Sequence, residues 1–227
     1  MDFISSFSTL AASSLALVLA ACSGTPKEPA ELVIIGDLSA STPLSTDKGF
    51  AEKAARAVTG MIGEYGLGDT VVLMSAGESG IEGTRRQSFR LTPQLNHKAV
   101  IAKVGATIAY SPDSPLSGQQ NTALTYAIEE SGLHCHGRDR LVLISDGMES
   151  RRGFDRMDEV IADTVDLPSP PAGILTGCKV SVLGIGVAAA GQSQLNNEEL
   201  RNLKAAWRKY FRSAGVADAD IELTSIF

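Results

Sequence analysis

The chain has 227 residues, of which 44% are hydrophobic and 20% charged, and its formal net charge at pH 7 is −6. These proportions are typical of a folded globular protein and exclude an intrinsically disordered one. The acidic balance and the small number of basic clusters argue against nucleic acid as a partner. At about 100 to 200 residues per domain, the length favours one domain with a sizeable hydrophobic core.

The N-terminal segment has the features of an export signal. Residues 10–21 are mostly apolar but too few to span a bilayer as a stable helix. They lead into Leu19-Ala20-Ala21-Cys22, which resembles the lipobox of bacterial lipoproteins. The resemblance implies cleavage before Cys22 and lipidation of this cysteine. The protein would then be anchored in the bacterial cell envelope on the extracytoplasmic side, which faces the periplasm in a Gram-negative cell. Residues 1–9 contain no Lys or Arg, which departs from the usual pattern, and an ordinary cleaved signal peptide is the alternative.

This interpretation divides the chain into three parts. Residues 1–21 are the signal peptide. Residues 22–30 comprise the lipidated cysteine and a short flexible tether that contains Ser, Gly and Pro. Residues 31–227 remain as the folded domain.

Short apolar segments alternate with amphipathic ones along this domain. The apolar segments are rich in Val, Ile and Leu without polar alternation, which is typical of strands covered on both faces. They span residues 32–36, 70–75, 140–145 and 179–186, with a last strand expected over 221–226. The amphipathic pattern predicts helices over residues 48–64, 94–105, 118–131 and 196–214. The alternation predicts an α/β fold with a Rossmann-like, open, mostly parallel central sheet flanked by helices.

Oxygen-bearing side chains follow two of the predicted strands. Asp37, Ser39 and Ser41 stand at alternate positions after the first strand, and Asp146 follows the strand that ends at residue 145. Thr122, early in the helix predicted over 118–131, brings a further hydroxyl. Ligands of such sheets bind at the carboxyl ends of the strands. Because oxygen-only clusters suit hard divalent cations, we expect a cation site at this edge.

These residues resemble the metal-ion-dependent adhesion site of von Willebrand factor type A (vWA) domains. The family pattern is Asp-x-Ser-x-Ser after strand one, a threonine from a second loop and an aspartate after the fourth strand. The five matching positions are Asp37, Ser39, Ser41, Thr122 and Asp146. Weaker matches are Ala127-Ile128 and residues 182–187. Three neighbouring positions depart from the family pattern, namely Thr42-Pro43, Gln120-Asn121 and Ser145.

The resemblance implies a binding function and not catalysis. In the family, hydroxyls bind the cation directly and the aspartates act through water or hold the hydroxyls in place. The expected cation is Mg²⁺, with Ca²⁺ or Mn²⁺ as alternatives. The expected partner is a protein that offers an acidic side chain to the open position on the metal.

Charged residues in neighbouring loops suggest where that partner makes contact. Glu149, Arg151 and Arg152 follow the metal aspartate, and Arg85-Arg86 lie in a loop expected over residues 77–89. Arginines around a metal that takes a carboxylate favour an acidic partner. Ordinary solvated surface charge is the alternative interpretation.

Two cysteines remain in the domain, and they precede two predicted strands. Cys135 comes six residues before the strand that starts near 141, and Cys178 two residues before the one near 180. If these strands are parallel neighbours, both cysteines lie at the same end of the sheet, and an exported protein retains disulfides. The alternatives are a disulfide and two separate thiols. The sequence His134-Cys135-His136 also suggests zinc, but it lacks a second pair of ligands and lies at the end opposite the aspartates.

Two further functions remain open. The first is a scaffolding lipoprotein in which a cation only stabilises the fold. The second is a Mg²⁺-dependent phosphohydrolase that uses Asp37 as the nucleophile. Such enzymes need a second aspartate two residues later, where this chain has Ser39.

Overall fold

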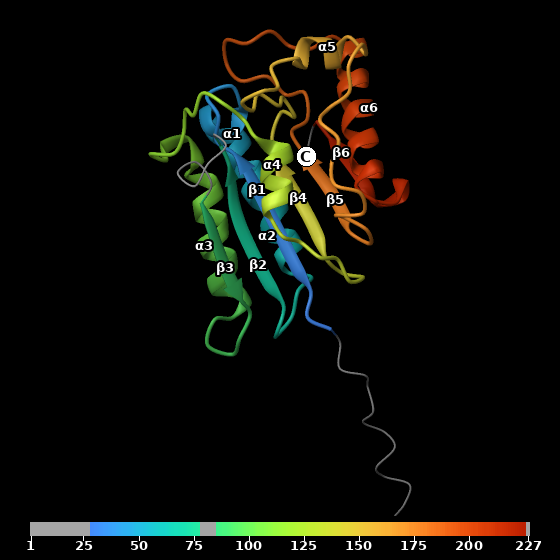
Figure 1. The fold of residues 1–227 in the computed structure, drawn as a ribbon. Helices are drawn as coiled ribbons and strands as arrows, with labels where there is room; N and C mark the ends of the chain where they lie inside the picture. The colour runs from blue at the N-terminus through green and yellow to red at the C-terminus, as the bar shows by residue number, and fades with distance from the viewer. Residues whose placement is uncertain (1–27, 78–84, 226–227) are drawn as a thin grey trace, which may run out of the picture.

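A six-stranded sheet forms the centre of the described protein. The computed structural model describes residues 28–77 and 85–225, so Cys22 and the predicted signal peptide lie outside the described residues. The strands occur in the spatial order β3-β2-β1-β4-β5-β6 (Figure 1). They are β1 (Glu31–Asp37), β2 (Thr70–Ala76), β3 (Arg86–Arg90), β4 (Arg140–Ile144), β5 (Lys179–Leu183) and β6 (Ile221–Thr224). All neighbours pair in parallel except β2 and β3, which are antiparallel. This is the order of doubly wound α/β folds, and it confirms the predicted fold class.

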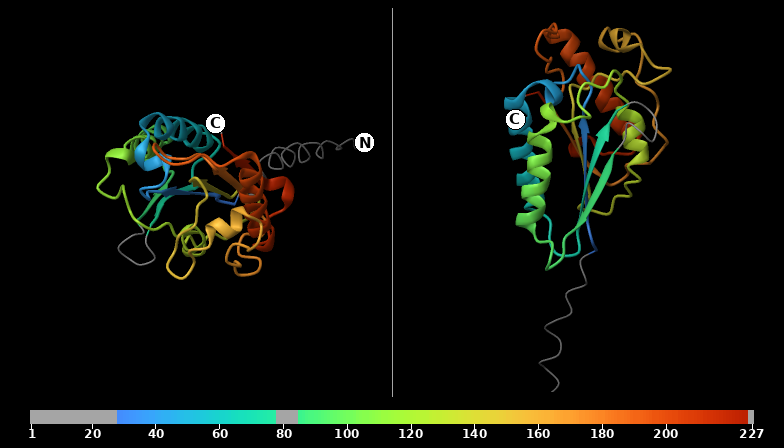
Figure 2. Two further views of the ribbon diagram at one scale, coloured as in Figure 1. Left: turned by 90° about the horizontal axis from the view of Figure 1, so that it is seen from above. Right: turned by 90° about the vertical axis from the view of Figure 1, so that its left-hand side faces the viewer.

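Helices cover both faces of the sheet (Figure 2). Their bounds are α1 (Pro43–Thr46), α2 (Lys48–Ile62), α3 (His97–Ala109), α4 (Leu124–Glu130), α5 (Met157–Ile161) and α6 (Asn197–Ser213), with 3-10 turns η2 (Ser111–Asp113) and η3 (Asp218–Asp220). Helices α2 and α3 pack on one face, and α4, α5 and α6 pack on the other. None of the helices in the described ranges is long and apolar enough to cross a membrane.

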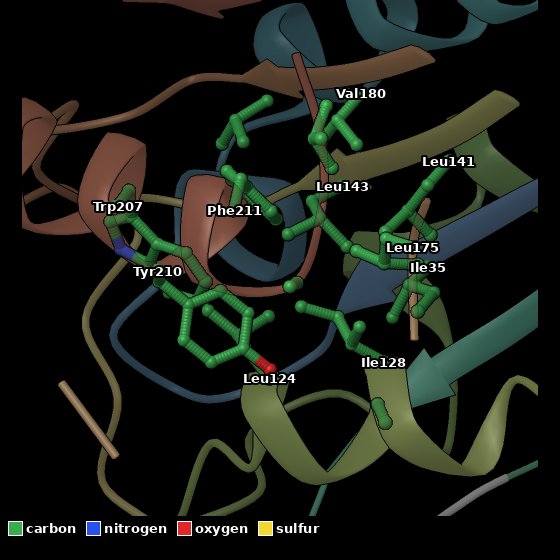
Figure 3. Packing of buried hydrophobic residues seen from close by; sticks show 14 of the residues in the cluster. Ile35, Leu124, Ile128, Leu141, Leu143, Leu175, Val180, Trp207, Tyr210 and Phe211 are labelled. Carbon is green, nitrogen blue, oxygen red and sulfur yellow. The ribbon is translucent and has the colours of Figure 1, made fainter. Parts of the chain in front are cut away.

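Successive residues of β1 divide the core into two layers. Leu32 and Ile34 point toward α2 and α3, whereas Val33 and Ile35 point toward α4 and α6. This follows from the period of two in a strand, and it requires apolar residues at every position because both faces are covered. On the α6 side the largest buried side chain is Trp207, which packs within the cluster shown in Figure 3.

Two aspartates hold the start of the domain at the amino edge of the sheet. Asp69 accepts a hydrogen bond from the Ala30 N–H at 2.8 Å and also pairs with Arg138. Asp139 accepts a hydrogen bond from the Glu31 N–H at 2.5 Å. The buried residues of both core layers come from Ala30 onward. A chain that begins at Ser23 therefore retains both layers of the described core.

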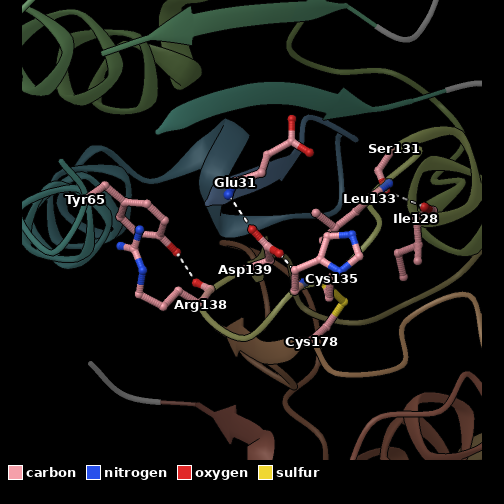
Figure 4. The surroundings of a disulfide bond; sticks show 10 residues. Glu31, Tyr65, Ile128, Ser131, Leu133, Cys135, Arg138, Asp139 and Cys178 are labelled. Atoms are coloured by element: carbon pink, nitrogen blue, oxygen red, sulfur yellow. Dashed lines mark hydrogen bonds between the residues drawn. A yellow bond between two sulfur atoms is a disulfide. The ribbon is translucent and has the colours of Figure 1, made fainter. Parts of the chain in front are cut away.

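A disulfide joins Cys135 and Cys178 at this same edge, with the two Cα atoms 5.0 Å apart (Figure 4). Cys178 directly precedes β5, and the segment after Cys135 leads into β4. The disulfide alternative is thereby confirmed, and two separate thiols are excluded. A zinc site at His134-Cys135-His136, against which the sequence already argued, lacks its thiol, because Cys135 is bonded to Cys178.

Several segments differ from the prediction. Residues 118–123 are not helical, and α4 begins only at Leu124. The reason is that the N–H groups of Gly118 and Gln119 donate hydrogen bonds to the Leu38 carbonyl in the loop after β1. Part of the predicted loop over 77–89 is the edge strand β3. Its sequence is polar, and only Phe89 is buried, so no apolar segment signals it. The strand predicted over 179–186 ends at Leu183.

Candidate metal centre

The carboxylate of Asp37, the last residue of β1, links three segments at the carboxyl edge of the sheet. It is fully buried. Its Oδ1 accepts hydrogen bonds from the Ser39 N–H at 3.0 Å and from the Thr122 hydroxyl at 3.4 Å. Its Oδ2 accepts a hydrogen bond from the Ser145 hydroxyl at 2.8 Å. One side chain therefore connects the loop after β1, the loop before α4 and the end of β4.

The loop after β1 presents two serine hydroxyls together. Ser39 Oγ and Ser41 Oγ lie 3.0 Å apart, with Ser39 buried and Ser41 partly exposed. Thr42 holds the loop by donating its hydroxyl to the Asp37 carbonyl at 2.9 Å, and Ser45 donates its hydroxyl to the Ser39 carbonyl. Because these hydrogen bonds close the loop on itself, the hydroxyls of Ser39 and Ser41 lie on the same side of the loop.

Thr122 is positioned by a two-way contact with Ser150. The Thr122 N–H donates to the Ser150 hydroxyl at 2.8 Å, and the Ser150 N–H donates to the Thr122 carbonyl at 2.9 Å. The Ala40 N–H also donates to the Gln119 carbonyl at 2.8 Å, which ties the segment before Thr122 to the first loop. These contacts across loops replace the helical bonds that the amphipathic pattern predicted here.

Asp146 lies in the turn directly after β4. It is 3% exposed, and its Oδ1 accepts a hydrogen bond from the Met148 N–H at 2.9 Å. Gly147 makes this turn with φ +82°, a conformation that favours glycine. A small hollow of about 60 Å³ borders Asp146 and is lined by residues of the loops after β4 and β5.

Burial dominates the electrostatics of both aspartates. Burial raises the pKa of Asp37 to about 6, although hydrogen bonds from Ser39, Ser145 and Thr122 oppose the shift. Burial and the nearby charge of Asp37 raise the pKa of Asp146 well above its usual value. Two ionised carboxylates at this edge therefore repel each other in a poorly solvated place. A bound cation would compensate for both costs.

The donor set fits a hard divalent cation. It consists of two carboxylates and the hydroxyls of Ser39, Ser41 and Thr122, all of them oxygens, which Mg²⁺, Ca²⁺ and Mn²⁺ prefer. Across residues 28–77 and 85–225, no group of three or more His, Cys, Asp or Glu side chains could hold a metal. A cation at this edge would therefore depend on hydroxyls as much as on carboxylates.

Four residues that support the centre were not predicted from the sequence to belong to it. Ser145 holds Asp37, Ser150 holds Thr122, and Thr42 and Ser45 close the first loop. Ser145 and Thr42 were noted only as departures from the family pattern. The available signal was the presence of hydroxyl residues directly beside the predicted ligands.

Glu149 does not lie on the surface rim where it was expected. Its side chain is fully buried, and its Oε2 accepts a hydrogen bond from the Thr125 N–H at 2.8 Å. Burial raises the pKa of Glu149 to about 7. The interpretation as a partner contact is wrong for this side chain, because it points into the protein behind the loop after β4.

The four arginines of the expected rim have different environments. Arg152 and Arg85 are exposed and Arg151 is partly exposed. Arg86, in β3, donates to the Ser131 carbonyl at 2.6 Å and approaches Glu31 at 3.8 Å. Ser131 follows the end of α4 and Glu31 begins β1, so the guanidinium of Arg86 is directed away from the candidate metal centre. The prediction that Arg86 lies on the partner rim is therefore wrong.

Comparisons with known proteins give matches in structure only. No known protein family matches the sequence, and no curated protein is similar to it. The pilus adhesin SpaC of Lactobacillus rhamnosus GG is 13% identical, with a TM-score of 0.46 over 88% of this chain and 28% of the adhesin. A von Willebrand factor type A protein of Catenulispora acidiphila is 17% identical, with a TM-score of 0.46 over 78% of this chain and 37% of that protein. An aerotolerance-related membrane protein of Bacteroides fragilis is 17% identical, with a TM-score of 0.42 over 82% of this chain and 98% of that protein.

The chain has an open, doubly wound α/β fold of the Rossmann type. This assignment rests on the strand order, on the helices on both faces, and on the parallel pairing of the neighbouring strands β2, β1, β4, β5 and β6. The fold places the ends of β1 and β4 side by side, since these two strands are direct neighbours in the sheet. Asp37 ends β1 and Asp146 follows β4, so the pairing of these two strands brings the two aspartates to the same part of the sheet edge.

Proposed function

We propose that this protein is a lipid-anchored extracytoplasmic binding domain that holds a protein partner through a divalent cation, most readily Mg²⁺. The observation that carries the proposal is the hydrogen-bonded convergence of three loops on Asp37, with Asp146 close enough for its pKa to respond to the Asp37 charge. No catalytic step is part of the proposal.

The partner would complete the metal coordination with an acidic side chain. Few charged ligands would contact the cation, because three of its five candidate ligands are neutral hydroxyls, so the cation would retain affinity for a further carboxylate. Ser41 is partly exposed and leaves the centre open on one side. Arg151 and Arg152 follow in the same loop as Asp146, and their charge favours an acidic partner.

The point where the chain enters the domain suits such a role. The chain enters the domain at the amino edge of the sheet, where Asp69 and Asp139 bind the backbone of Ala30 and Glu31. The candidate metal centre lies at the carboxyl edge. A lipid on Cys22 would therefore leave the binding edge directed away from the membrane.

The test is calorimetric titration of Mg²⁺, Ca²⁺ and Mn²⁺ into the metal-stripped chain that begins at Ser23. We expect saturable binding of about one ion per chain, and loss of that binding in Asp37→Ala. The sheet of the variant should remain folded, because neither core layer includes Asp37, although the Thr122 and Ser145 hydroxyls lose their acceptor.

The matched control is Asp166→Ala, which removes an exposed carboxylate that pairs with Lys209. Cation binding by this variant should equal that of the unmodified chain. Binding that persists at full strength in Asp37→Ala would contradict the proposed centre. Circular dichroism of each variant separates loss of the site from loss of the fold.

A scaffolding role is the second candidate, and the complete burial of Asp37 favours it, because a cation held there could act purely on stability. The two functions differ in the partner. Cation-dependent capture of an acidic protein that is lost in Asp37→Ala supports adhesion. A cation that raises the unfolding temperature without changing any capture supports the scaffold. Cation-dependent hydrolysis of a phosphate ester would instead support the phosphohydrolase alternative.

A further inference from the structure

A cavity of about 250 Å³ lies at the carboxyl edge of the sheet, on the face covered by α2 and α3. Its inner wall consists of buried apolar side chains. They are Leu38, Leu44, Ile108 and Ile144, and the partly buried Leu73 and Leu116 continue the wall outward. The cavity is separate from the metal centre, because Gly36 and Leu38 face it while Asp37 between them points to the other face.

The cavity lies beside two small residues at matching positions. Gly36 of β1 pairs with Ser75 of β2. The preceding pair on the same face of the sheet consists of the bulky residues Ile34 and Leu73. Because glycine has no side chain, Leu44 packs close to Gly36, where a Cβ atom would lie 3.2 Å from the Leu44 Cδ2, and the short side chain of Ser75 leaves the neighbouring sheet surface open. The 3-10 turn η2 and the residues after it cover the hollow without filling it.

Among the described residues that line the cavity, Arg85 is the one charged residue, and the buried Ser75 and Ser111 add hydroxyls to the lining. Arg85, Gln87 and Thr107 line the mouth of the cavity and are exposed. The backbone of Arg85 is held by Ser75, whose hydroxyl accepts the Arg85 N–H at 3.0 Å. None of the ion pairs formed among the described residues involves the Arg85 guanidinium.

We infer that this cavity binds a small amphipathic carboxylic acid, with its aliphatic chain against the leucine and isoleucine wall and its carboxylate on Arg85. An apolar wall with one cation at the entrance selects this chemistry, because the wall gains from burying methylenes and the guanidinium pairs with a carboxylate. The same charge repels an amine. The size is sufficient, since a cavity of about 150 Å³ in another protein holds benzene.

The probe for the test is octanoate, titrated into the chain that begins at Ser23 with carbon-13 labels on the isoleucine methyl groups. We expect saturable shifts at Ile108 and Ile144, which line the cavity, and no shifts at Ile185 and Ile221, which belong to the other core layer. Affinity should rise about fourfold per added methylene from butyrate through hexanoate to octanoate. Octylamine should produce no saturable shift.

Two variants test the wall and the charge separately. Thr107→Trp places a large side chain at the exposed mouth and should abolish the octanoate shifts, whereas Ala102→Trp, at an exposed position of the same helix away from the cavity, should preserve them. Arg85→Gln should weaken octanoate about tenfold. Arg90→Gln at the other end of β3 should leave it unchanged.

Several results would overturn the inference. They are the absence of saturable shifts at Ile108 and Ile144, undiminished binding in Thr107→Trp, and octanol or octylamine binding as tightly as octanoate.

The inference does not depend on the cation. Octanoate binding should therefore be the same in the presence of EDTA and of Mg²⁺, so that failure of the metal centre and failure of this cavity are distinguishable.

Discussion

Glu149 combines complete burial with incomplete hydrogen bonding. Its Oε1, the Thr125 hydroxyl and the Tyr210 hydroxyl lack hydrogen-bond partners within the described part of the chain. Tyr210 comes from α6, and Figure 3 shows its hydroxyl directed toward α4 near Leu124. Burial is the main cause that raises the pKa of Glu149 to about 7. A protonated Glu149 can donate a hydrogen bond, whereas an ionised one leaves a poorly solvated charge.

This raised pKa predicts a dependence of stability on pH. The folded chain retains the Glu149 proton up to about pH 7, while the unfolded chain loses it near pH 4.5, the ordinary pKa of a glutamate. The contribution to the free energy of unfolding is therefore fully present below about pH 4.5 and lost as the pH rises through about 7. Its total size is roughly 3 kcal/mol. Glu149→Gln should consequently become more stable relative to the unmodified chain between pH 5 and pH 8.

The measurement is urea unfolding of both proteins over this pH range in EDTA. The difference between them isolates Glu149, because the contributions of the other carboxylates are common to both. A difference that stays constant with pH would show that Glu149 is ionised in the folded protein throughout the range.

At the scale of single elements, α6 supports the loop that carries Asp146. The helix begins with a capping box between Asn196 and Glu199. From its buried face, Trp207 Nε1 donates a hydrogen bond to the Gly147 carbonyl at 2.8 Å. A Cβ atom at Gly147 would lie 3.0 Å from that nitrogen, so the turn and the indole fit only with glycine. The helix thus holds the turn after β4 by a direct contact.

We expect Trp207→Phe to lower the free energy of unfolding by about 1–3 kcal/mol, because it leaves the buried Gly147 carbonyl without its donor. It should also weaken cation binding, since Asp146 precedes this turn. The control is Arg208→Ala, which removes a solvent-accessible ion pair and a long hydrogen bond to Asp218 and should change stability by less than about 1 kcal/mol. Urea unfolding and cation titration of the two variants test this, and equal behaviour of Trp207→Phe and the unmodified chain would contradict it.

At the scale of the whole molecule, the two edges of the sheet have different roles. The amino edge carries the disulfide and the aspartates that hold the start of the domain. The carboxyl edge carries the candidate metal centre and the mouth of the cavity. Because all strands except β3 run in the same direction, every loop that follows these strands meets at one edge.

This separation predicts that the disulfide affects stability and not the metal. The bond closes a segment with a sequence separation of 43 residues between Cys135 and Cys178. The double variant Cys135→Ala/Cys178→Ala should lose about 2–4 kcal/mol of unfolding free energy. Its affinity for Mg²⁺ should equal that of the unmodified chain in calorimetric titration. A folded double variant without cation binding would show that the two edges are coupled.

Parts of the fold with strong local patterns could be predicted from the sequence. The buried strands β1, β2, β4 and β5 have apolar residues at nearly every position, because both faces of the sheet are covered. Strand β3 could not be found in this way. It lies at the sheet edge, and its residues are polar except for Phe89, so its pairing with β2 alone defines it.

The candidate site divides in the same way. The positions of Asp37, Ser39 and Ser41 were predictable because their alternate spacing follows directly from a strand end. The actual place of Thr122 was not, because backbone bonds to the loops at Ala40 and Ser150 override the helical periodicity of its segment.

The sequence by itself determined the alternation of strands and helices, the residue types available for a cation and the disulfide as one of two alternatives. These depend on local spacing and composition, which a linear chain carries in full. Only the tertiary structure decided that Ser145 holds Asp37, that Glu149 is buried and that a cavity opens beside Gly36 and Ser75. Each of these depends on which residues of distant segments share a register or a face, and that is established only when the strands pair.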